Sequence, residues 1–322
     1  MTAPGSSADP VDIPVIDLSQ FPNELDGEEV TQLQNHELLA TVEKACKEWG
    51  CFRVVNHGIP VDHLRDVESL IRQAFAMPAE VKERAIIVNP EARSSYNETF
   101  DFENLPKSDS VQQMYDKIWP QDGNPEFRET IQGFTLNLAA LQAKISKIFI
   151  ASLGLDIKSV YHSDFEKCKA FMGINHYTPN GEILEEDAEI MHPHTDIGCF
   201  TILYNDDEGG LQVRSKKGKW VDIDPVPNSF VIMVSDCVKA WSNGRYHSVE
   251  HRVVYKGWKD RISVAYVVLF ADDLKIWAAP ELIDNDNPRR FKPFNYQPFK
   301  DAYFLNYHIT KEKLETFIDI YA

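Results

Sequence analysis

The chain has 322 residues, of which 50 are acidic and 33 are basic, and its net charge is −17. With 43% hydrophobic residues it can bury a large core, which excludes a disordered or fibrous protein. The negative charge repels nucleic-acid phosphates and acidic membrane surfaces, so we expect neither as a partner.

The sequence carries no recognisable signal for export or membrane insertion. No stretch approaches the roughly 20 apolar residues that span a bilayer, and residues 1–10 lack the basic and apolar regions of a secretory signal. The five cysteines are widely spaced and include no Cys-x-x-Cys pair, a pattern typical of reduced thiols. We therefore expect a cytoplasmic protein, and we expect it to be a monomer.

The first half of the chain is predicted to be rich in helices. Short apolar runs at residues 14–18 and 51–55 predict two strands. Apolar residues that recur every three or four positions predict helices over residues 28–49, 61–76 and 127–153. Residues 86–125 are polar and contain several prolines, so we expect loops with short helical pieces there.

The pattern changes after residue 168. Short runs of β-branched and aromatic residues alternate with turn signals such as Pro179-Asn180-Gly181 and Asn243-Gly244. Strands at this spacing are typical of a sandwich or barrel. Near the end of the chain, residues 310–321 are expected to form a final helix.

These patterns predict an α+β protein with a mainly β core, organised as a single domain over residues 1–322. No internal repeat or low-complexity linker separates the two halves. We expect a helix-rich part at residues 12–165 to brace a β core at residues 168–285, with a C-terminal extension and helix at residues 286–322.

A metal-binding pattern occurs within the predicted β core. Residues i and i+2 of a strand share a face, so an extended chain directs His194 and Asp196 into the same space. A second histidine, His251, follows in another predicted strand. Two imidazoles and one carboxylate on one face of a metal leave the opposite positions open, which suits non-haem Fe(II) in oxygenases.

Two further pairs of polar residues share a strand face. Arg261 and Ser263 stand at the start of the apolar strand 262–270, and a guanidinium with a hydroxyl can bind a carboxylate. Asn175 and Tyr177 form another such pair before the His-x-Asp motif. All of these candidates fall in the predicted β core.

The order of these motifs resembles the plant-type 2-oxoglutarate/Fe(II)-dependent dioxygenases related to isopenicillin N synthase. The resemblance covers about residues 12–320 and rests on the segments Asn56-His57-Gly58-Ile59-Pro60, His194-x-Asp196, Trp241-Ser242-Asn243-Gly244-Arg245-Tyr246, Ser248-Val249-x-His251-Arg252 and Arg261-x-Ser263. It implies a double-stranded β-helix, or jelly roll, flanked by helices. Two departures lie at the edge of the cosubstrate site: Gly173 stands where relatives often have a basic residue, and Asn180 where they often have proline.

The resemblance also implies roles for individual residues. His194, Asp196 and His251 would be the Fe(II) ligands and the catalytic centre, and Arg261 and Ser263 would hold the distal carboxylate of 2-oxoglutarate, assisted by Tyr177 and Asn175. The implied reaction converts 2-oxoglutarate and O2 to succinate and CO2 while a substrate is oxidised, most often by hydroxylation, with ascorbate as a candidate reductant.

The substrate implied is a small, mostly apolar metabolite such as a plant hormone or a product of secondary metabolism. By position, the expected pocket residues are Tyr96, Phe102, Phe200, Tyr266 and Phe304.

Four alternatives compete with this interpretation. An oxidase of the same fold could use the Arg261 and Ser263 pair for a different carboxylate, and a jelly-roll module could bind ligands without catalysis. Residues 247–251 match the His-x-x-Glu-His motif of zinc peptidases, but that chemistry needs a helix and the flanking turns predict a strand. The acidic run 205–208 has the composition of a calcium site, and we interpret it instead as a solvated hairpin tip.

Overall fold

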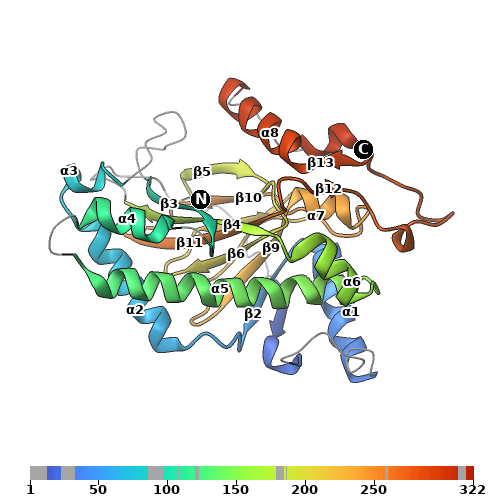
Figure 1. Ribbon diagram of the computed structural model, residues 1–322, viewed down its shortest axis with the longest axis horizontal. Coiled ribbons are helices and arrows are strands. Elements are labelled where there is room, and N and C mark those ends of the chain that lie inside the picture. The colour runs from blue at the N-terminus through green and yellow to red at the C-terminus, as the bar shows by residue number, and fades with distance from the viewer. Residues whose placement is uncertain are drawn as a thin grey trace, which may run out of the picture.

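A computed structural model describes residues 13–22, 33–85, 97–107, 109–119, 123–178, 185, 187–257, 260–310 and 317–322. Two β-sheets form the centre of the molecule, and helices cover the outer face of the larger sheet (Figure 1). This is the predicted α+β arrangement with a mainly β core. The functional residues lie where the two sheets face each other.

The larger sheet has seven strands in the order β1-β2-β9-β6-β11-β4-β3. Its strands are β1 (Val15–Asp17), β2 (Cys51–Val55), β3 (Asn97–Leu105), β4 (Lys169–Tyr177), β6 (Phe200–Asn205), β9 (Phe230–Val234) and β11 (Arg261–Leu269). The β1–β2 pair is parallel and the other pairs are antiparallel. The first 105 residues thus contribute three strands to the sheet that also holds β4, β6, β9 and β11 of the second half.

The smaller sheet has four strands in the order β5-β10-β7-β8. Its strands are β5 (Glu189–His194), β10 (His251–Val254), β7 (Leu211–Arg214) and β8 (Trp220–Asp222). All its pairs are antiparallel. A separate two-stranded ribbon joins β12 (Lys275–Ile276) to β13 (Phe294–Asn295).

Three helices form where the apolar spacing predicts them: α1 (Leu33–Glu48), α2 (Val61–Phe75) and α5 (Pro125–Ser152). The other α-helices of the described residues are α3 (Ala79–Lys82), α4 (Ser110–Ile118), α6 (Ile157–Val160), α7 (Asp236–Trp241) and α8 (Tyr296–Thr310). The long helix α5 begins at a side-chain cap, because Asn124 Oδ1 accepts the backbone N–H of Phe127 at 3.1 Å and Pro125 occupies the first turn. Helices α1 and α2 both contact α5 beside the larger sheet (Figure 1).

The two faces of the larger sheet carry different side chains. Even-numbered residues of β4, β6 and β11, such as Ile174, Phe200 and Val264, join the main apolar cluster with the helices. On the opposite face, Leu203 and Val231 join a smaller apolar cluster with residues of β7, and Ala265 packs against it. Because successive side chains alternate, each strand serves both clusters at once. The inner space between the sheets is therefore lined by the odd-numbered residues of β4, β6 and β11.

Two elements differ from the sequence prediction. Residues 86–125 were expected to be loops with helical pieces, and they include the nine-residue edge strand β3 together with α4. The sequence did not predict this strand because its inward-facing residues are polar and its apolar alternation is limited to Phe100 and Phe102. The final helix was expected at 310–321, whereas α8 ends at Thr310 and a short 3-10 helix follows at Phe317–Tyr321.

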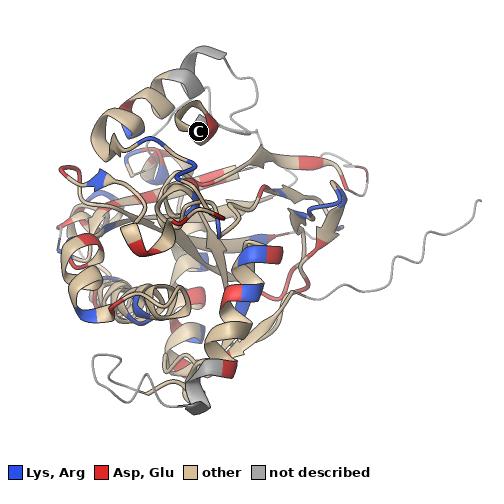
Figure 2. Ribbon diagram, turned by 90° about the vertical axis from the view of Figure 1, so that its right-hand side faces the viewer, with Lys and Arg blue, Asp and Glu red and all other residues tan. Residues whose placement is uncertain are grey.

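Among the described residues, no helix is both long and apolar enough to cross a membrane. Figure 2 shows acidic and basic positions distributed over the helices and loops that surround the sheets. All five cysteines are free thiols, as the sequence predicts.

Candidate active site

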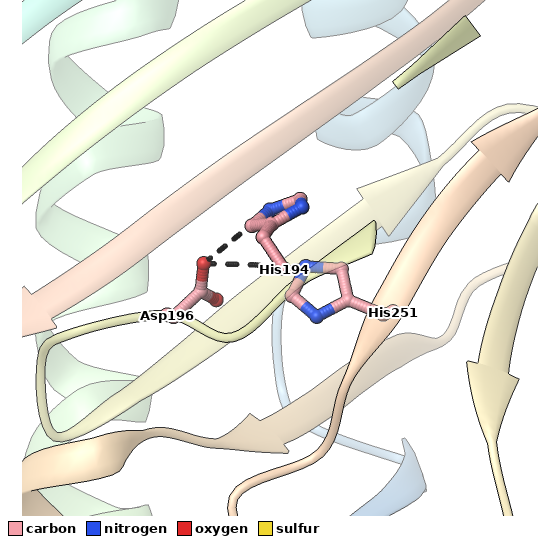
Figure 3. Close-up of side chains that lie close together, drawn as sticks. All are labelled: His194, Asp196 and His251. Carbon is pink, nitrogen blue, oxygen red and sulfur yellow. Dashed lines mark ion pairs between the residues drawn. The ribbon is translucent and has the colours of Figure 1, made fainter. Parts of the chain in front are cut away.

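His194, Asp196 and His251 meet between the two sheets (Figure 3). His194 ends β5, His251 begins β10, and the antiparallel register places the two residues directly opposite each other. Asp196 lies just after β5, on the chain that leads to β6. Its Oδ1 lies 3.9 Å from His194 Nε2 and 4.0 Å from His251 Nε2. Three potential ligand atoms therefore converge on one point.

Both imidazoles are oriented by hydrogen bonds to backbone carbonyls two residues earlier. His194 Nδ1 lies 2.8 Å from the carbonyl oxygen of His192, and His251 Nδ1 lies 3.2 Å from that of Val249. Since a carbonyl oxygen only accepts, each Nδ1 carries the proton and each Nε2 presents a lone pair. This is the tautomer that a metal requires, so the residues fit a divalent ion.

The third candidate ligand, Asp196, is fixed by a hydroxyl and by backbone contacts. Thr201 Oγ1 donates a hydrogen bond to Asp196 Oδ2, which leaves Oδ1 facing the two histidines. The backbone N–H of Asp236 donates to the carbonyl oxygen of Asp196 at 2.9 Å, and Thr195 Oγ1 donates to Asp236 Oδ2 at 3.2 Å. The ligand turn is thus bound to both β6 and α7.

Burial sets the charge state of the site. The side chain of His251 is 7% exposed, and that of His194 is 28% exposed. Burial, with a smaller contribution from His194, lowers the pKa of His251 to about 4, so its imidazole is neutral at physiological pH. The more exposed His194 marks the side from which reactants can enter.

Replacing Thr201 with valine is expected to weaken Fe(II) binding by about 10-fold, because outer partners of metal ligands typically contribute 10- to 100-fold. Without the hydroxyl, Asp196 Oδ2 loses its donor and the carboxylate can rotate. The measurement is Fe(II) affinity by competition with a chelator. Thr135→Val is the matched control, since Thr135 is also buried but bonds a carbonyl within α5. Equal Fe(II) affinities in the two variants would contradict the role assigned to Thr201.

Arg261 lies buried at the start of β11 on the same inner face. Its Nε donates to the carbonyl oxygen of Gly209 at 3.0 Å, and its Nη2 donates to Asn205 Oδ1 at 2.7 Å. The guanidinium also lies 4.8 Å from the centre of the Tyr177 ring. Nη1 is buried and has no hydrogen-bond partner among the described residues. A buried charged donor left unpaired is costly, so this atom fits the carboxylate of a ligand.

Polar side chains form a row beside Arg261 across four neighbouring strands. The register pairs Thr99 with Asn175, Asn175 with Ser263, and Ser263 with Asn205. Thr99 Oγ1 donates to Asn175 Oδ1 at 3.0 Å. Tyr177 stands opposite Arg261 in the next row. The four residues expected around a carboxylate are therefore neighbours on one face.

Most of the expected pocket residues lie elsewhere. Phe102, Phe200 and Tyr266 are fully buried on the helix-covered face of the larger sheet, so the prediction that they line the pocket was wrong. Phe200 packs edge-on against Phe149 of α5, and the Tyr266 hydroxyl donates to Gln142 Oε1 of the same helix at 3.1 Å. Tyr96 lies outside the described residues.

Phe304 is 49% exposed on α8. The hydroxyl of its neighbour Tyr303 lies 3.4 Å from the carbonyl oxygen of Thr195, between the two ligands of the His-x-Asp motif. Helix α8 therefore reaches the edge of the site, and Phe304 as a pocket residue stays a prediction.

Replacing Tyr266 with phenylalanine is expected to lower the free energy of unfolding by about 1–3 kcal/mol, because the buried Gln142 carbonyl loses its donor. The KM values for the two organic substrates that the family resemblance implies, 2-oxoglutarate and the metabolite, should stay unchanged, since the Tyr266 hydroxyl faces α5. Chemical denaturation and steady-state kinetics measure the two effects. A changed KM with unchanged stability would return Tyr266 to the pocket.

Two further expectations concern motifs near the site. Residues 247–250 form no helix and His251 begins a strand, which excludes the zinc-peptidase geometry for His247. The run 205–208 was expected to be a solvated hairpin tip. Asp207 and Glu208 are exposed, as expected, but Asp206 is 3% exposed and Asn205 bonds Arg261. For Asp206 the expectation was wrong, because this carboxylate accepts hydrogen bonds from the backbone N–H of Ile262 in β11 and from the Arg72 side chain of α2.

Comparisons with known proteins agree with this geometry. The 2OG-Fe(II) oxygenase superfamily matches residues 168–269, and the N-terminal family of the non-haem dioxygenase in morphine synthesis matches residues 13–132. A flavonol synthase/flavanone 3-hydroxylase from Eustoma exaltatum subsp. russellianum is 31% identical over 304 residues, covering 90% of this chain and 85% of that protein. The chain belongs to the plant-type 2-oxoglutarate/Fe(II)-dependent dioxygenases.

Solved structures support the fold and the cofactors of this dioxygenase. The rice dioxygenase for auxin oxidation superposes with a TM-score of 0.80 at 30% identity, covering 97% of this chain and all of that one. JOX2, solved in complex with 2-oxoglutarate, iron and JA, gives a TM-score of 0.72 at 27% identity, covering 93% of this chain and 87% of that one. The jelly-roll fold, the enzymatic activity and the use of Fe(II) and 2-oxoglutarate are thereby confirmed. The two alternatives of the same fold, an oxidase without 2-oxoglutarate and a non-enzymatic module, are set aside.

Four residues that support the site were missed in the sequence. They are Thr201, Asn205, Asp236 and Tyr303. For Thr201 and Asn205 a signal existed, because they alternate with the apolar residues of one strand and so face the same side. Asp236 and Tyr303 reach the site only through tertiary contacts.

Proposed function

We propose that His194, Asp196 and His251 bind the catalytic Fe(II), and that Arg261, with Ser263, Asn175 and Tyr177, holds the distal carboxylate of 2-oxoglutarate. The observation that carries this proposal is the pairing of three convergent ligand atoms with a buried, unpaired Arg261 Nη1 on one enclosed face. Thr201 and Asn205 project from the same face of β6, four residues and so roughly 13 Å apart. That spacing suits a short dicarboxylate held by the metal at one end and by Arg261 at the other.

In this arrangement the protein mainly orients and shields the reactants. The His194 and His251 rings are fixed by backbone carbonyls, and Asp196 by Thr201, so the ligands need no rearrangement when the ion binds. Arg261 supplies charge where water is excluded, which strengthens its bond to a carboxylate. Bound Fe(II) would supply the oxidising chemistry, in which 2-oxoglutarate and O2 are converted to succinate and CO2 while one oxygen atom enters the hydroxylated substrate.

The proposed substrate is a small, mostly apolar metabolite that is hydroxylated. The named relatives act on or are solved with compounds of this kind: flavonoids, auxin and JA. Gly173 and Ala265 pair on the inner face and leave room beside the Asn175 and Ser263 row. The exposed Phe304 and the apolar Leu203 offer surfaces for such a compound. We further propose a cytoplasmic monomer that uses ascorbate to maintain the reduced iron, with no nucleic-acid or membrane partner.

The first test requires no knowledge of the substrate. Fe(II) and then 2-oxoglutarate are added anaerobically to the purified protein, and the visible charge-transfer band of the iron chelate is recorded. We expect a saturable band, followed on admission of air by succinate release that increases with the correct metabolite. Screening should begin with carboxylic acids and phenols that contain an indole, cyclopentanone or flavanone ring system. Iron binding without the band would contradict the assignment of the 2-oxoglutarate site.

A further inference from the structure

A cluster of charged side chains links helix α2 to the strand ends that carry Arg261 and its acceptor. We define the Arg72 cluster as Arg72, Glu68, Asp206 and Asp260. Arg72 Nη2 donates to Asp206 Oδ2 at 2.9 Å and to Glu68 Oε1 at 3.0 Å, and Nη1 donates to Asp260 Oδ2. One guanidinium thus bridges three carboxylates from three segments: Glu68 of α2, Asp206 just after β6 and Asp260 just before β11.

The two aspartates of the cluster adjoin the 2-oxoglutarate site in sequence and in space. Asp260 immediately precedes Arg261, and Asp206 immediately follows Asn205, which accepts from Arg261 Nη2. Asp206 also binds the next residue of β11, since its Oδ2 accepts the N–H of Ile262 at 2.6 Å and its own N–H donates to the Ile262 carbonyl at 3.1 Å. The residues on both sides of Arg261 are therefore bound to the Arg72 cluster.

The charge balance of this region depends on Arg72. The side chain of Asp206 is 2% exposed, and burial raises its pKa, while Arg261 and Arg72 favour the ionised form. If Arg72 were removed, Arg261 would be the nearest cation left for a buried carboxylate. Its guanidinium would then be drawn toward Asp206 and away from the inner space. His176, which bonds Asp260 and stacks on Phe75, would still hold the other aspartate.

We propose that Arg72 is a positioning residue for 2-oxoglutarate binding: by neutralising Asp206 and Asp260 it keeps the Arg261 guanidinium, and the unpaired Nη1 above all, directed into the site. This inference rests on the proposed role of Arg261. Helix α2, which lies outside the β core, then affects the affinity for 2-oxoglutarate without affecting the affinity for Fe(II).

The test compares 2-oxoglutarate affinity with iron affinity in variants of Arg72. In Arg72→Met, the Kd for 2-oxoglutarate from the anaerobic charge-transfer titration should rise about 10-fold, within the range for residues that share one salt-bridge network. The Kd for Fe(II) should stay at the wild-type value. Arg72→Lys, which keeps one charge but cannot bridge three carboxylates, should give a smaller rise and serves if the Met variant does not fold.

Two further variants separate positioning from general stability. Arg65→Met on the same helix is the matched control, because Arg65 is 75% exposed and pairs only with Asp62 among the described residues. Adding Asp206→Asn to Arg72→Met should restore 2-oxoglutarate affinity, since the amide still accepts from Ile262 but no longer attracts Arg261. An unchanged 2-oxoglutarate Kd in Arg72→Met, or a parallel loss of iron affinity that Asp206→Asn does not restore, would overturn the inference. Absence of the band in the wild type would instead contradict the proposed function.

Discussion

Replacing His251 with alanine is expected to abolish turnover, with a loss larger than the 10- to 100-fold that removal of an outer partner costs a metal site. His251 is the most buried of the three ligands, and its Nε2 faces Asp196 Oδ1 at 4.0 Å. Two remaining ligands cannot hold an ion that must also accept 2-oxoglutarate and O2. The charge-transfer band should disappear together with activity, and circular dichroism should show an unchanged fold.

The matched control for this variant is His192→Ala. The His192 side chain is 93% exposed and pairs with Glu189, while only its backbone carbonyl contacts His194. Loss of the His192 imidazole should therefore leave iron binding and kcat at the wild-type values. Measurable turnover in His251→Ala, at iron saturation, would show that another residue completes the metal site.

Replacing Arg261 with methionine should raise the KM for 2-oxoglutarate by about 30-fold or more, since loss of one partner from a buried charge pair costs roughly 2–5 kcal/mol. Arg261 is 1% exposed, and its Nη1 has no other partner among the described residues. Fe(II) affinity should change little, because Arg261 contacts neither histidine nor Asp196 through the bonds described above. Steady-state kinetics with 2-oxoglutarate as the varied substrate measures the effect.

Two further variants test whether the change in the KM for 2-oxoglutarate is specific to the Arg261 guanidinium. Arg261→Lys keeps a charge but not the planar fork, so its KM should lie between the wild-type and methionine values. Arg53→Met removes another buried arginine of the same sheet, one that bonds Ser229 and the carbonyl of Asp224. It should lower stability and leave the KM for 2-oxoglutarate unchanged. A similar KM in both methionine variants would mean that Arg261 serves only the fold.

Strand alternation accounts both for the side chains that meet on the inner face and for the pocket residues that were predicted wrongly. The rule that places Arg261 and Ser263 on one face of a strand also places Tyr266 on the other face. In β6, the same alternation places Phe200 on the opposite face from Thr201 and Asn205. Phe102 lies on β3, a strand that the sequence did not predict, so alternation could not be applied to it. Applied consistently along each strand, alternation would have assigned Tyr266 and Phe200 to the helix-packed core.

Local spacing and motifs of a few residues were enough to predict the α+β class, the helices α1, α2 and α5, and the family. These three helices lie close to the ranges that their apolar periodicity predicts, and His194, Asp196 and His251 became candidate ligands through the order of several motifs taken together. Only the tertiary structure decided which side chains meet across distant segments. It placed Asp206 beside Arg72 and Ile262 and buried this one carboxylate of an acidic run that composition predicted to be solvated. Contacts between residues 56 and 134 positions apart, such as these, depend on sheet register and helix packing, and local propensity contains neither.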